Sequence, residues 1–391
     1  MERKINVALF VDNFAVIDGV VMVIRQYAKR LHGRANVYVV CPRSSRNELS
    51  ETYTIVPCPS IRVPILNYDV AVPFGRQRFI KRMRSLDIDL VHVHSPFMVG
   101  SLGLKVAQAL DVPCVATLHS QYKQDFEIYL KSKTVAKTAL KGIMKLYNAS
   151  TESWVVNTKV EELLCSYGYE GTTHIIPNAT DDTPIEDVEA AKAEVNEKLG
   201  FRPEDKVLMY LGRITGQKNV FFTEKVLCAL KDRGFDFKFI FVGGGTALNS
   251  LKETVRNDGL WNNVVFTGSC TDRDYIKKLY ARSDLFVFPS YYDTDGIVKY
   301  EAAAQGTPTV FAEGTLALAG IEDGVNGYVG PNDAEAFADK IIDIFSDEAR
   351  HERVSENVKT ALYRTWDKTV DAVYERYNYL IDQNKAKKQQ N

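Results

Sequence analysis

Short, continuously apolar runs that alternate with stretches of helical periodicity are the feature of this chain that most restricts its fold. Strands that are apolar on both faces lie in covered sheets, and strands separated by helices run parallel. Such runs are found at residues 5–10, 37–40, 90–93, 112–118, 154–156, 174–176, 207–211, 237–242, 264–267, 285–289 and 309–311, with helices predicted near 97–110, 121–148 and 158–166. The sequence therefore predicts an α/β fold with two doubly wound, Rossmann-like domains that bind ligands at the carboxyl ends of their strands.

Length and charge both favour two domains. The chain has 391 residues, which is too many for one ordinary core. Residues 1–178 carry 22 basic and 15 acidic side chains, a net charge of +7, so the remainder carries −8 of the total of −1. A basic half and an acidic half indicate domains with different partners. The segment 179–204, rich in Asp, Glu, Ala and Pro, is predicted to connect them.

The cysteines and the apolar runs indicate where the protein works. The six cysteines are scattered and include no Cys-x-x-Cys pair, which argues against a zinc site and a disulfide framework and favours a reducing cytoplasm. No apolar run approaches the roughly 18 to 20 residues that cross a bilayer. The first run breaks at Asp12 and is predicted to be a strand rather than a secretory signal. We therefore expect a cytoplasmic protein.

A polar loop follows the predicted strand at 285–289. Asp293 lies in this loop, a helix is predicted to begin near Gly296, and Glu301 lies about a turn and a half into that helix. The start of a helix offers free N–H groups and a favourable dipole to an anion. Carboxylates accept hydrogen bonds from hydroxyl-rich ligands. Without further context, the same residues are equally consistent with a solvated acidic loop and a surface glutamate.

This pattern of two acids with seven residues between them resembles the motif of retaining glycosyltransferases of family four (group 1), which have the GT-B fold. The resemblance implies two Rossmann-like domains that face each other across a cleft. It also implies that Asp293 contacts the donor sugar and that Glu301 holds the ribose. The backbone amides of Gly296, Ile297 and Val298 would bind sugar and phosphate.

The chain departs from the family pattern at two positions. The first acid of the motif is usually Glu, and Asp293 is one methylene shorter. A Phe commonly precedes the glycine, where this chain has Asp295. Both departures bear on the identity of the sugar rather than on the nucleotide site.

The resemblance also implies a domain organisation. Residues 1–180 would form the acceptor-side domain, completed by a C-terminal helix at 366–384 that crosses back onto it. Residues 200–360 would form the domain that binds the nucleotide sugar. Residues 385–391 form a polar tail that we expect to be disordered.

Further motifs match the family in the expected order. Arg213 and Lys218 follow a predicted strand, and two fixed cations there would stabilise the charge that a departing diphosphate gains. Gly243 and Gly244 resemble the turn that passes under the base and ribose, and Gly19 resembles the glycine loop that approaches the donor phosphates. Taken alone, the cations would be a solvated surface and the glycines plain turns.

Histidines close two of the predicted strands in the first half. His119 resembles the family's active-site histidine beside the donor sugar, whereas without the motif context it would be a structural histidine. His92 and His94 share one face of a strand. They are not predicted to bind a metal, because no third ligand follows at a recognisable spacing.

The resemblance implies a hexosyltransferase that moves glucose or N-acetylglucosamine from a UDP-sugar to a lipid, glycan or protein-linked acceptor and builds an α-glycoside. No cofactor or metal is expected, because the cations and the helix terminus supply positive charge. No nucleic-acid partner is expected. A UDP-sugar epimerase of the same architecture and a non-catalytic partner subunit of a glycosyltransferase complex remain alternatives.

Two basic segments of the first half point to a peripheral contact with the inner face of an anionic membrane. In residues 75–84, Phe79, Ile80 and Met83 share one helical face, and five cations flank it. Basic amphipathic helices of this kind lie on anionic membranes. Alternatively, the apolar face packs in the core and the cations are solvated or bind a polyanionic glycan. A second stripe of cations consists of Lys131, Lys133, Lys137, Lys141 and Lys145.

Overall fold

The computed structural model describes residues 3–14, 18–43, 50–63, 68–72 and 75–390, which form two compact units. Unit 1 consists of Met1–Asn178 and Trp366–Asn391, and unit 2 consists of Ala179–Thr365. Unit 2 thus begins at Ala179, ahead of the predicted start at residue 200. The segment 179–204 is not a mere connection, because it belongs to unit 2 and contains helix α7 (Val188–Leu199).

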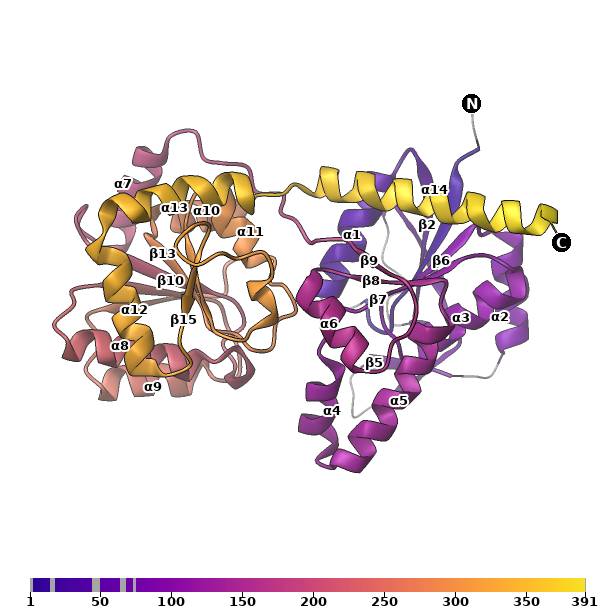
Figure 1. The fold of residues 1–391 in the computed structure, drawn as a ribbon, viewed down its shortest axis with the longest axis horizontal. Coiled ribbons are helices and arrows are strands. Elements are labelled where there is room, and N and C mark those ends of the chain that lie inside the picture. Colours follow the sequence, from indigo (N-terminus) through magenta and orange to yellow (C-terminus); the bar gives the residue numbers. More distant parts are fainter. Residues whose placement is uncertain (1–2, 15–17, 44–49, 64–67, 73–74, 391) are drawn as a thin grey trace. The chain divides into compact units, whose positions relative to one another are not determined.

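Unit 1 is built on a sheet of seven parallel strands in the order β3-β2-β1-β6-β7-β8-β9. Helices pack around the sheet (Figure 1). The strands are β1 (Ile5–Phe10), β2 (Ala35–Cys41), β3 (Thr54–Pro57), β6 (Leu90–Val93), β7 (Cys114–Thr117), β8 (Glu152–Val155) and β9 (Thr173–Ile175). The helices are α1 (Gly19–Leu31), α2 (Arg76–Ser85), α3 (Met98–Leu110), α4 (Tyr122–Leu130), α5 (Lys133–Ala149), α6 (Thr158–Ser166) and α14 (Trp366–Gln390). A separate antiparallel hairpin pairs β4 (Ser60–Val63) with β5 (Tyr68–Ala71).

The C-terminal helix α14 completes unit 1. Tyr377 is fully buried, stacks on Trp154 of β8 and hydrogen-bonds to His92 of β6 over 2.6 Å. Arg30 of α1 pairs with Asp367 near the start of α14. The last helix is therefore held in the core of the unit formed by the first part of the chain.

Unit 2 has a sheet of six parallel strands in the order β12-β11-β10-β13-β14-β15. Its strands are β10 (Val207–Leu211), β11 (Lys238–Val242), β12 (Val264–Gly268), β13 (Leu285–Phe288), β14 (Thr309–Ala312) and β15 (Tyr328–Gly330). Besides α7, its helices are α8 (Val220–Asp232), α9 (Leu248–Asn257), α10 (Arg273–Arg282), α11 (Val298–Ala304), α12 (Ala334–Ser346) and α13 (Glu348–Ala361), with short 3-10 turns η3 (Gly216–Lys218) and η4 (Leu316–Leu318). Side chains from both faces of the sheet are buried in two separate hydrophobic clusters. The predicted α/β class with two parallel sheets is confirmed.

Three expectations about helices are corrected. The helix predicted over 121–148 is two helices, because Lys131 ends α4 in a left-handed conformation (φ 50°) and the Ser132 hydroxyl caps α5 by accepting from the Val135 N–H. The tail at 385–391 is not disordered as expected, because α14 continues to Gln390. Asn384 and Lys388 anchor this last part to the Asp111 carbonyl.

The third correction concerns the predicted membrane-binding face of α2. Phe79, Ile80 and Met83 share one face as predicted, but they are buried inside unit 1, at 5%, 8% and 0% exposure. This apolar face is therefore used for packing and is closed to a membrane. In the described part of the chain, no helix combines the length and the hydropathy that a membrane crossing requires.

Candidate active site

The predicted charged residues of unit 2 lie at the point where its strand order reverses. β10 and β13 are neighbours at the centre of the sheet, although they are far apart in sequence. Arg213 and Lys218 follow β10, and Asp293 follows β13. In open parallel sheets, the crevice outside the carboxyl ends of two such strands is where ligands bind. The topology therefore gathers three predicted residues at one ligand-binding position.

Lys218 and Asp293 form an ion pair in which Lys218 Nζ lies 2.5 Å from Asp293 Oδ1. Both side chains are mostly buried, at 14% and 19% exposure. The second carboxylate oxygen, Oδ2, is buried and has no hydrogen-bond partner among the described residues. Buried acceptors are nearly always satisfied in folded proteins, so this oxygen is suited to a ligand hydroxyl. Arg213 is exposed, and it forms no ion pair in the described chain.

Glu301 lies in a second cluster of charges close to the same loop. Arg273 bridges two acids, with Nη2 at 2.8 Å from Glu301 Oε1 and at 2.6 Å from Asp182 Oδ2. The Tyr280 hydroxyl donates to Glu301 Oε2 over 3.3 Å. Burial raises the pKa of Glu301, while the positive charge of Arg273 opposes that shift. Glu301 is thus held in one orientation, with lone pairs left for the hydroxyl groups of a ligand. It lies in the first turn of α11, nearer the helix start than expected.

The predicted glycines of unit 2 allow backbone segments to approach closely. A Cβ on Gly243 would lie 1.9 Å from the Gly212 carbonyl oxygen, and one on Gly244 would lie 2.5 Å from Ser269 Oγ. Gly296 has a φ of 75°, a left-handed conformation that glycine adopts without strain, and Phe288 packs against it. Ile297 and Val298 follow at the start of α11, where backbone N–H groups lack intrahelical acceptors.

A buried charge network under this loop was missed by the sequence interpretation. Asp295 and Lys299 are 0% and 2% exposed, and they form an ion pair of 2.5 Å. The Tyr300 hydroxyl donates to Asp295 over 2.9 Å, and Lys299 donates to the Ala317 carbonyl over 3.1 Å. The position where the family commonly has Phe is therefore still buried here, with an i,i+4 lysine as its partner. The network fixes both sides of Gly296.

In unit 1, three histidines are stacked at the ends of β6 and β7. The ring centroids of His92 and His94 are 4.0 Å apart, and those of His94 and His119 are 5.2 Å apart. His94 Nδ1 and His119 Nε2 share a hydrogen bond of 3.0 Å. Burial lowers the pKa of His119 to about 4, so its imidazole is neutral at neutral pH. His119 can therefore act as a hydrogen-bonding group but not as a cation, and His94 sets which of its nitrogens carries the proton.

Gly19 and Asp12 both follow β1 in unit 1. Gly19 is the first residue of α1, next to the Asp18 cap, and open space surrounds its would-be side chain. Asp12 follows β1 and accepts a hydrogen bond from the Val99 N–H over 3.1 Å. Burial raises the pKa of Asp12 to about 7. The loop before Asp18 lies outside the described residues, so the environment of Gly19 is seen only from the helix side.

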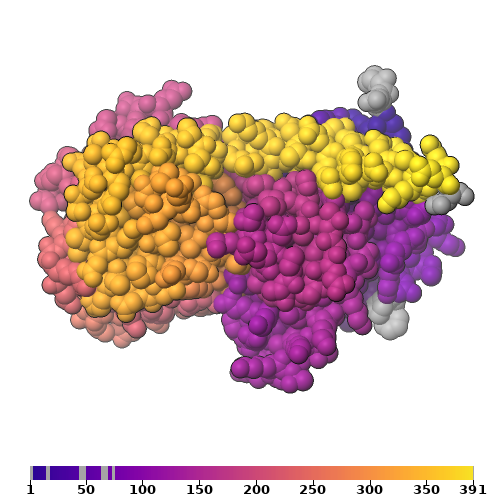
Figure 2. Space-filling view, viewed as in Figure 1, coloured from indigo at the N-terminus to yellow at the C-terminus, as the bar shows by residue number. Residues whose placement is uncertain are grey.

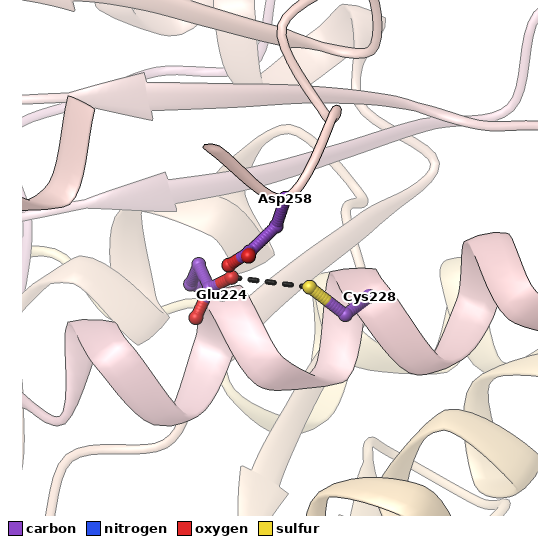
Figure 3. A group of neighbouring side chains, drawn as sticks. All are labelled: Glu224, Cys228 and Asp258. Atoms are coloured by element: carbon purple, nitrogen blue, oxygen red, sulfur yellow. Dashed lines mark hydrogen bonds between the residues drawn. The ribbon is translucent and has the colours of Figure 1, made fainter. Parts of the chain in front are cut away.

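Elsewhere in unit 2, Glu224, Cys228 and Asp258 point toward one another (Figure 3). Their ligand atoms lie within 4.8 Å of one another, and Cys228 Sγ donates to Glu224 over 3.1 Å. Burial and a hydrogen bond to Asp258 raise the pKa of Glu224 to about 7. A proton shared between the two carboxyl groups accounts for their proximity. None of the three is a predicted site residue.

Two protein-family models match successive parts of the chain, one in each half. The model described as Glycosyltransferase Family 4 matches residues 17–183, and the model described as Glycosyl transferases group 1 matches residues 191–361. The chain belongs to the group 1 glycosyltransferases. The predicted family is therefore confirmed.

Curated relatives of this glycosyltransferase match over most of their length. The alpha-monoglucosyldiacylglycerol synthase of Streptococcus pneumoniae is 25% identical, over 78% of this chain and 70% of the relative. The protein of the same name from Acholeplasma laidlawii is 26% identical, over 80% and 81%. A GDP-mannose-dependent alpha-mannosyltransferase of Corynebacterium glutamicum is 22% identical, over 84% and 77%.

Solved structures establish the fold of this glycosyltransferase as GT-B. Anabaena HepE in complex with UDP has a TM-score of 0.76 at 18% identity, covering 97% of this chain and 100% of HepE. Sucrose-phosphate synthase from Thermosynechococcus elongatus has a TM-score of 0.77 at 20% identity, covering 97% and 100%. The predicted fold class is thus confirmed for the chain as a whole.

Proposed function

We propose that this glycosyltransferase is a retaining, UDP-hexose-dependent hexosyltransferase. The observation that carries the proposal is the Lys218–Asp293 pair at the strand-order reversal of unit 2, with a buried carboxylate oxygen that has no partner in the described chain. An acid with one free oxygen suits a sugar hydroxyl, and the adjacent lysine suits the phosphate attached to that sugar.

The nucleotide half of the donor fits the remaining groups. Glu301, held by Arg273, would accept the ribose hydroxyls, and the close turn at Gly243 and Gly244 would pass under the base and ribose. UDP as the nucleotide is supported by HepE, which is known in complex with UDP and with UDP-glucose. Because one relative is named as GDP-mannose-dependent, the identity of the base is tested separately from the rest of the proposal.

The reaction breaks the bond between the sugar's anomeric carbon and the diphosphate oxygen, and it forms a bond from that carbon to an acceptor hydroxyl on the same face. The leaving phosphate oxygen takes the acceptor proton. Arg213 and Lys218 would stabilise the negative charge that grows on the diphosphate in the transition state. Neutral His119 would contribute a hydrogen bond without placing another positive charge beside the sugar.

Diacylglycerol in a membrane is the acceptor that we propose. Two relatives are named alpha-monoglucosyldiacylglycerol synthases. The α4–α5 hairpin projects from the rest of unit 1 (Figures 1 and 2), and its tip exposes apolar side chains. Those side chains are Ile128, Tyr129, Leu130 and Val135, and exposed lysines at 131, 133, 137, 141 and 145 follow along the hairpin. Apolar groups beside cations favour contact with an anionic membrane surface.

A transfer assay tests the proposal. The purified chain is incubated with UDP-glucose or UDP-N-acetylglucosamine and with diacylglycerol in vesicles, with released UDP and the product's anomeric proton as readouts. We expect UDP release that depends on the acceptor, an α-linked product and no loss of rate in excess chelator. A β-linked product would contradict retention, and epimerised UDP-sugar without acceptor would favour the epimerase. Absence of UDP release with every donor would favour the non-catalytic subunit.

A further inference from the structure

A basic hollow of about 500 Å³ lies in unit 1 beside the carboxyl ends of β2 and β3. Arg43 follows β2, Ser60 begins β4 after β3, and α2 contributes Arg78 and Arg82. Apolar lining comes from Pro57, Pro59, Val72 and Phe79. The hollow lies at the edge where parallel sheets bind their ligands, and it contains none of the residues assigned to the nucleotide site.

The three arginines of this hollow are electrostatically uncompensated. Arg43, Arg78 and Arg82 form no ion pair with any acid in the described part of the chain, and all three are exposed. Arg78 and Arg82 are four residues apart on α2, where like charges face one another and repel. Other arginines of unit 1, such as Arg3 and Arg34, do pair with acids. The charge of the hollow therefore calls for an anion from outside the described chain.

A second hollow, in unit 2, is lined by both cations and acids and serves as a comparison. It has a volume of about 610 Å³ and is lined by Lys192, Lys206 and Lys359, but also by acids. Those acids are Asp284, Glu348, Glu352 and Glu356. Two hollows of similar size thus differ in the charges of their lining residues. Of the two, the hollow in unit 1 is lined by cations and by no acid, whereas the hollow in unit 2 is lined by both.

The groups in the unit 1 hollow match a phosphate. A guanidinium donates two parallel hydrogen bonds to phosphate oxygens, which makes arginine the preferred residue for this anion. Ser60 Oγ already accepts from the Arg43 N–H over 3.0 Å, so its own hydroxyl proton can be donated to a ligand. The apolar residues would hold the body that carries the phosphate. Cations from β2's end and from α2 would then close on one group from two sides.

We propose that this hollow binds a phosphate group, carried either by a small soluble phosphate ester or by a membrane lipid headgroup. The inference extends the proposed function, because it gives the acceptor-side unit a site for an anionic phosphate in addition to the uncharged lipid acceptor. It rests on the proposed function only in calling unit 1 the acceptor side, since phosphate binding itself does not depend on UDP. The two sources share one chemistry, and they are separated by whether the phosphate binds in free solution.

The test uses the full chain and two probes at low salt. sn-Glycerol 3-phosphate is titrated by calorimetry, and vesicles of phosphatidylcholine with or without phosphatidylglycerol are used in sedimentation. The variants are Arg78→Gln and Arg82→Gln, singly and together. Lys81→Gln is the matched control, because it removes one exposed charge from the same helix outside the hollow. UDP binding to each variant is measured in parallel and should be unchanged.

We expect each arginine variant to weaken binding about tenfold or more, as for lost hydrogen bonds to a charged group, while Lys81→Gln binds nearly as the parent does. Binding of glycerol 3-phosphate would identify a soluble phosphate ligand, and binding of phosphatidylglycerol vesicles alone would identify a headgroup. Equal losses in Lys81→Gln and in the arginine variants would overturn the proposal, as would absence of saturable binding to both probes. If the parent chain does not bind UDP, the proposed function is wrong, whereas the proposed phosphate site is unaffected by that result.

Discussion

The carboxyl ends of the two parallel sheets carry different chemistry on the same architecture. In unit 1, β6 and β7 end in stacked imidazoles, and His119 is neutral because burial lowers its pKa to about 4. In unit 2, β10 and β13 end in the charged pair Lys218–Asp293. Doubly wound sheets place whatever follows their strands at one edge. The topology therefore supplies the position, and the residues after each strand decide whether that position is neutral or charged.

The difference teaches how each unit is suited to its part of the reaction. In the proposed reaction a diphosphate gains negative charge as the sugar leaves, so fixed cations in unit 2 would stabilise the transition state. A group beside an electron-poor anomeric carbon should not add positive charge, a requirement that a neutral imidazole in unit 1 would meet. Substitutions that remove charge should therefore harm unit 2 most, and the contributions of His119 and Glu224 to stability should depend on pH with opposite signs.

The largest effect is expected from the buried pair under the unit 2 loop. Asp295→Ala leaves Lys299 buried without its partner, which should lower the free energy of unfolding by about 3–5 kcal/mol. Replacing both residues, as Asp295→Ala with Lys299→Met, should recover most of that loss. Urea denaturation measures both. The exposed pair Lys192–Glu189 is the control, and Glu189→Ala should cost less than about 1 kcal/mol. Equal costs for the two pairs would contradict the assignment.

The next effect concerns turnover. Lys218→Ala should reduce the rate of UDP release about 100- to 1000-fold, as when one preorganised transition-state donor is lost. The fold should persist, because Lys218 lies in the 3-10 turn η3 outside the sheet, although Asp293 loses its partner. Lys225→Ala, an exposed lysine on the following helix, should leave the rate unchanged. If both variants retain full activity, the cation of unit 2 has no catalytic part.

The third effect in order of size is the pH dependence of stability that His119 gives to unit 1. His119 binds a proton near pH 6.5 when unfolded but only near pH 4 when folded, so the unfolded state holds more protons between these values. Stability is therefore present above pH 6.5 and is lost as the pH falls toward 4, by about 3 kcal/mol for this residue. His119→Gln should flatten the curve in denaturation experiments, and His32→Gln, at an exposed position, should leave it unaltered.

The smallest effect is a change of opposite sign in unit 2. Burial and Asp258 raise the pKa of Glu224 from 4.5 to about 7, so the folded state keeps a proton that the unfolded state releases. Stability from this group is present below pH 4.5 and is lost as the pH rises through about 7. Glu224→Gln should therefore gain stability over the parent as the pH rises from 5 to 8, by about 2–3 kcal/mol for a shift of this size. Glu253→Gln, on the exposed face of α9, should show no such trend. An identical trend in both variants would argue against the shared proton.

Much of the sheet could be predicted from the sequence. The bounds of β1, β6 and β10 coincide with their apolar runs, because a strand buried on both faces is apolar at nearly every position. Strand β3, the hairpin strands β4 and β5 and the short strand β15 were missed, since they contain polar residues or are only three or four residues long. The break between α4 and α5 depends on a left-handed Lys131, which periodicity does not reveal.

The site could be predicted only where residues follow strands directly. Asp293 and Lys218 were assigned through the resemblance to the family's motifs, which place these residues just after strands. Arg273 and Asp182 reach Glu301 from 28 and more residues away, and only the packed fold brings such groups together. The partner of Asp295 did leave a signal, because Lys299 lies at i,i+4 on the adjoining helix turn.

The central claim is that unit 2 holds the nucleotide, and calorimetric titration of UDP tests it most directly. Glu301→Ala removes the carboxylate that would bind the ribose, and it should weaken UDP binding by about 1.5–3 kcal/mol, the range for hydrogen bonds to a charged group. His119→Gln, in unit 1, should leave UDP affinity unchanged, because UDP lacks the donor hexose that His119 would contact. The account predicts loss in the first variant and parent-like affinity in the second. Unchanged affinity in Glu301→Ala, or an equal loss in both, would contradict it.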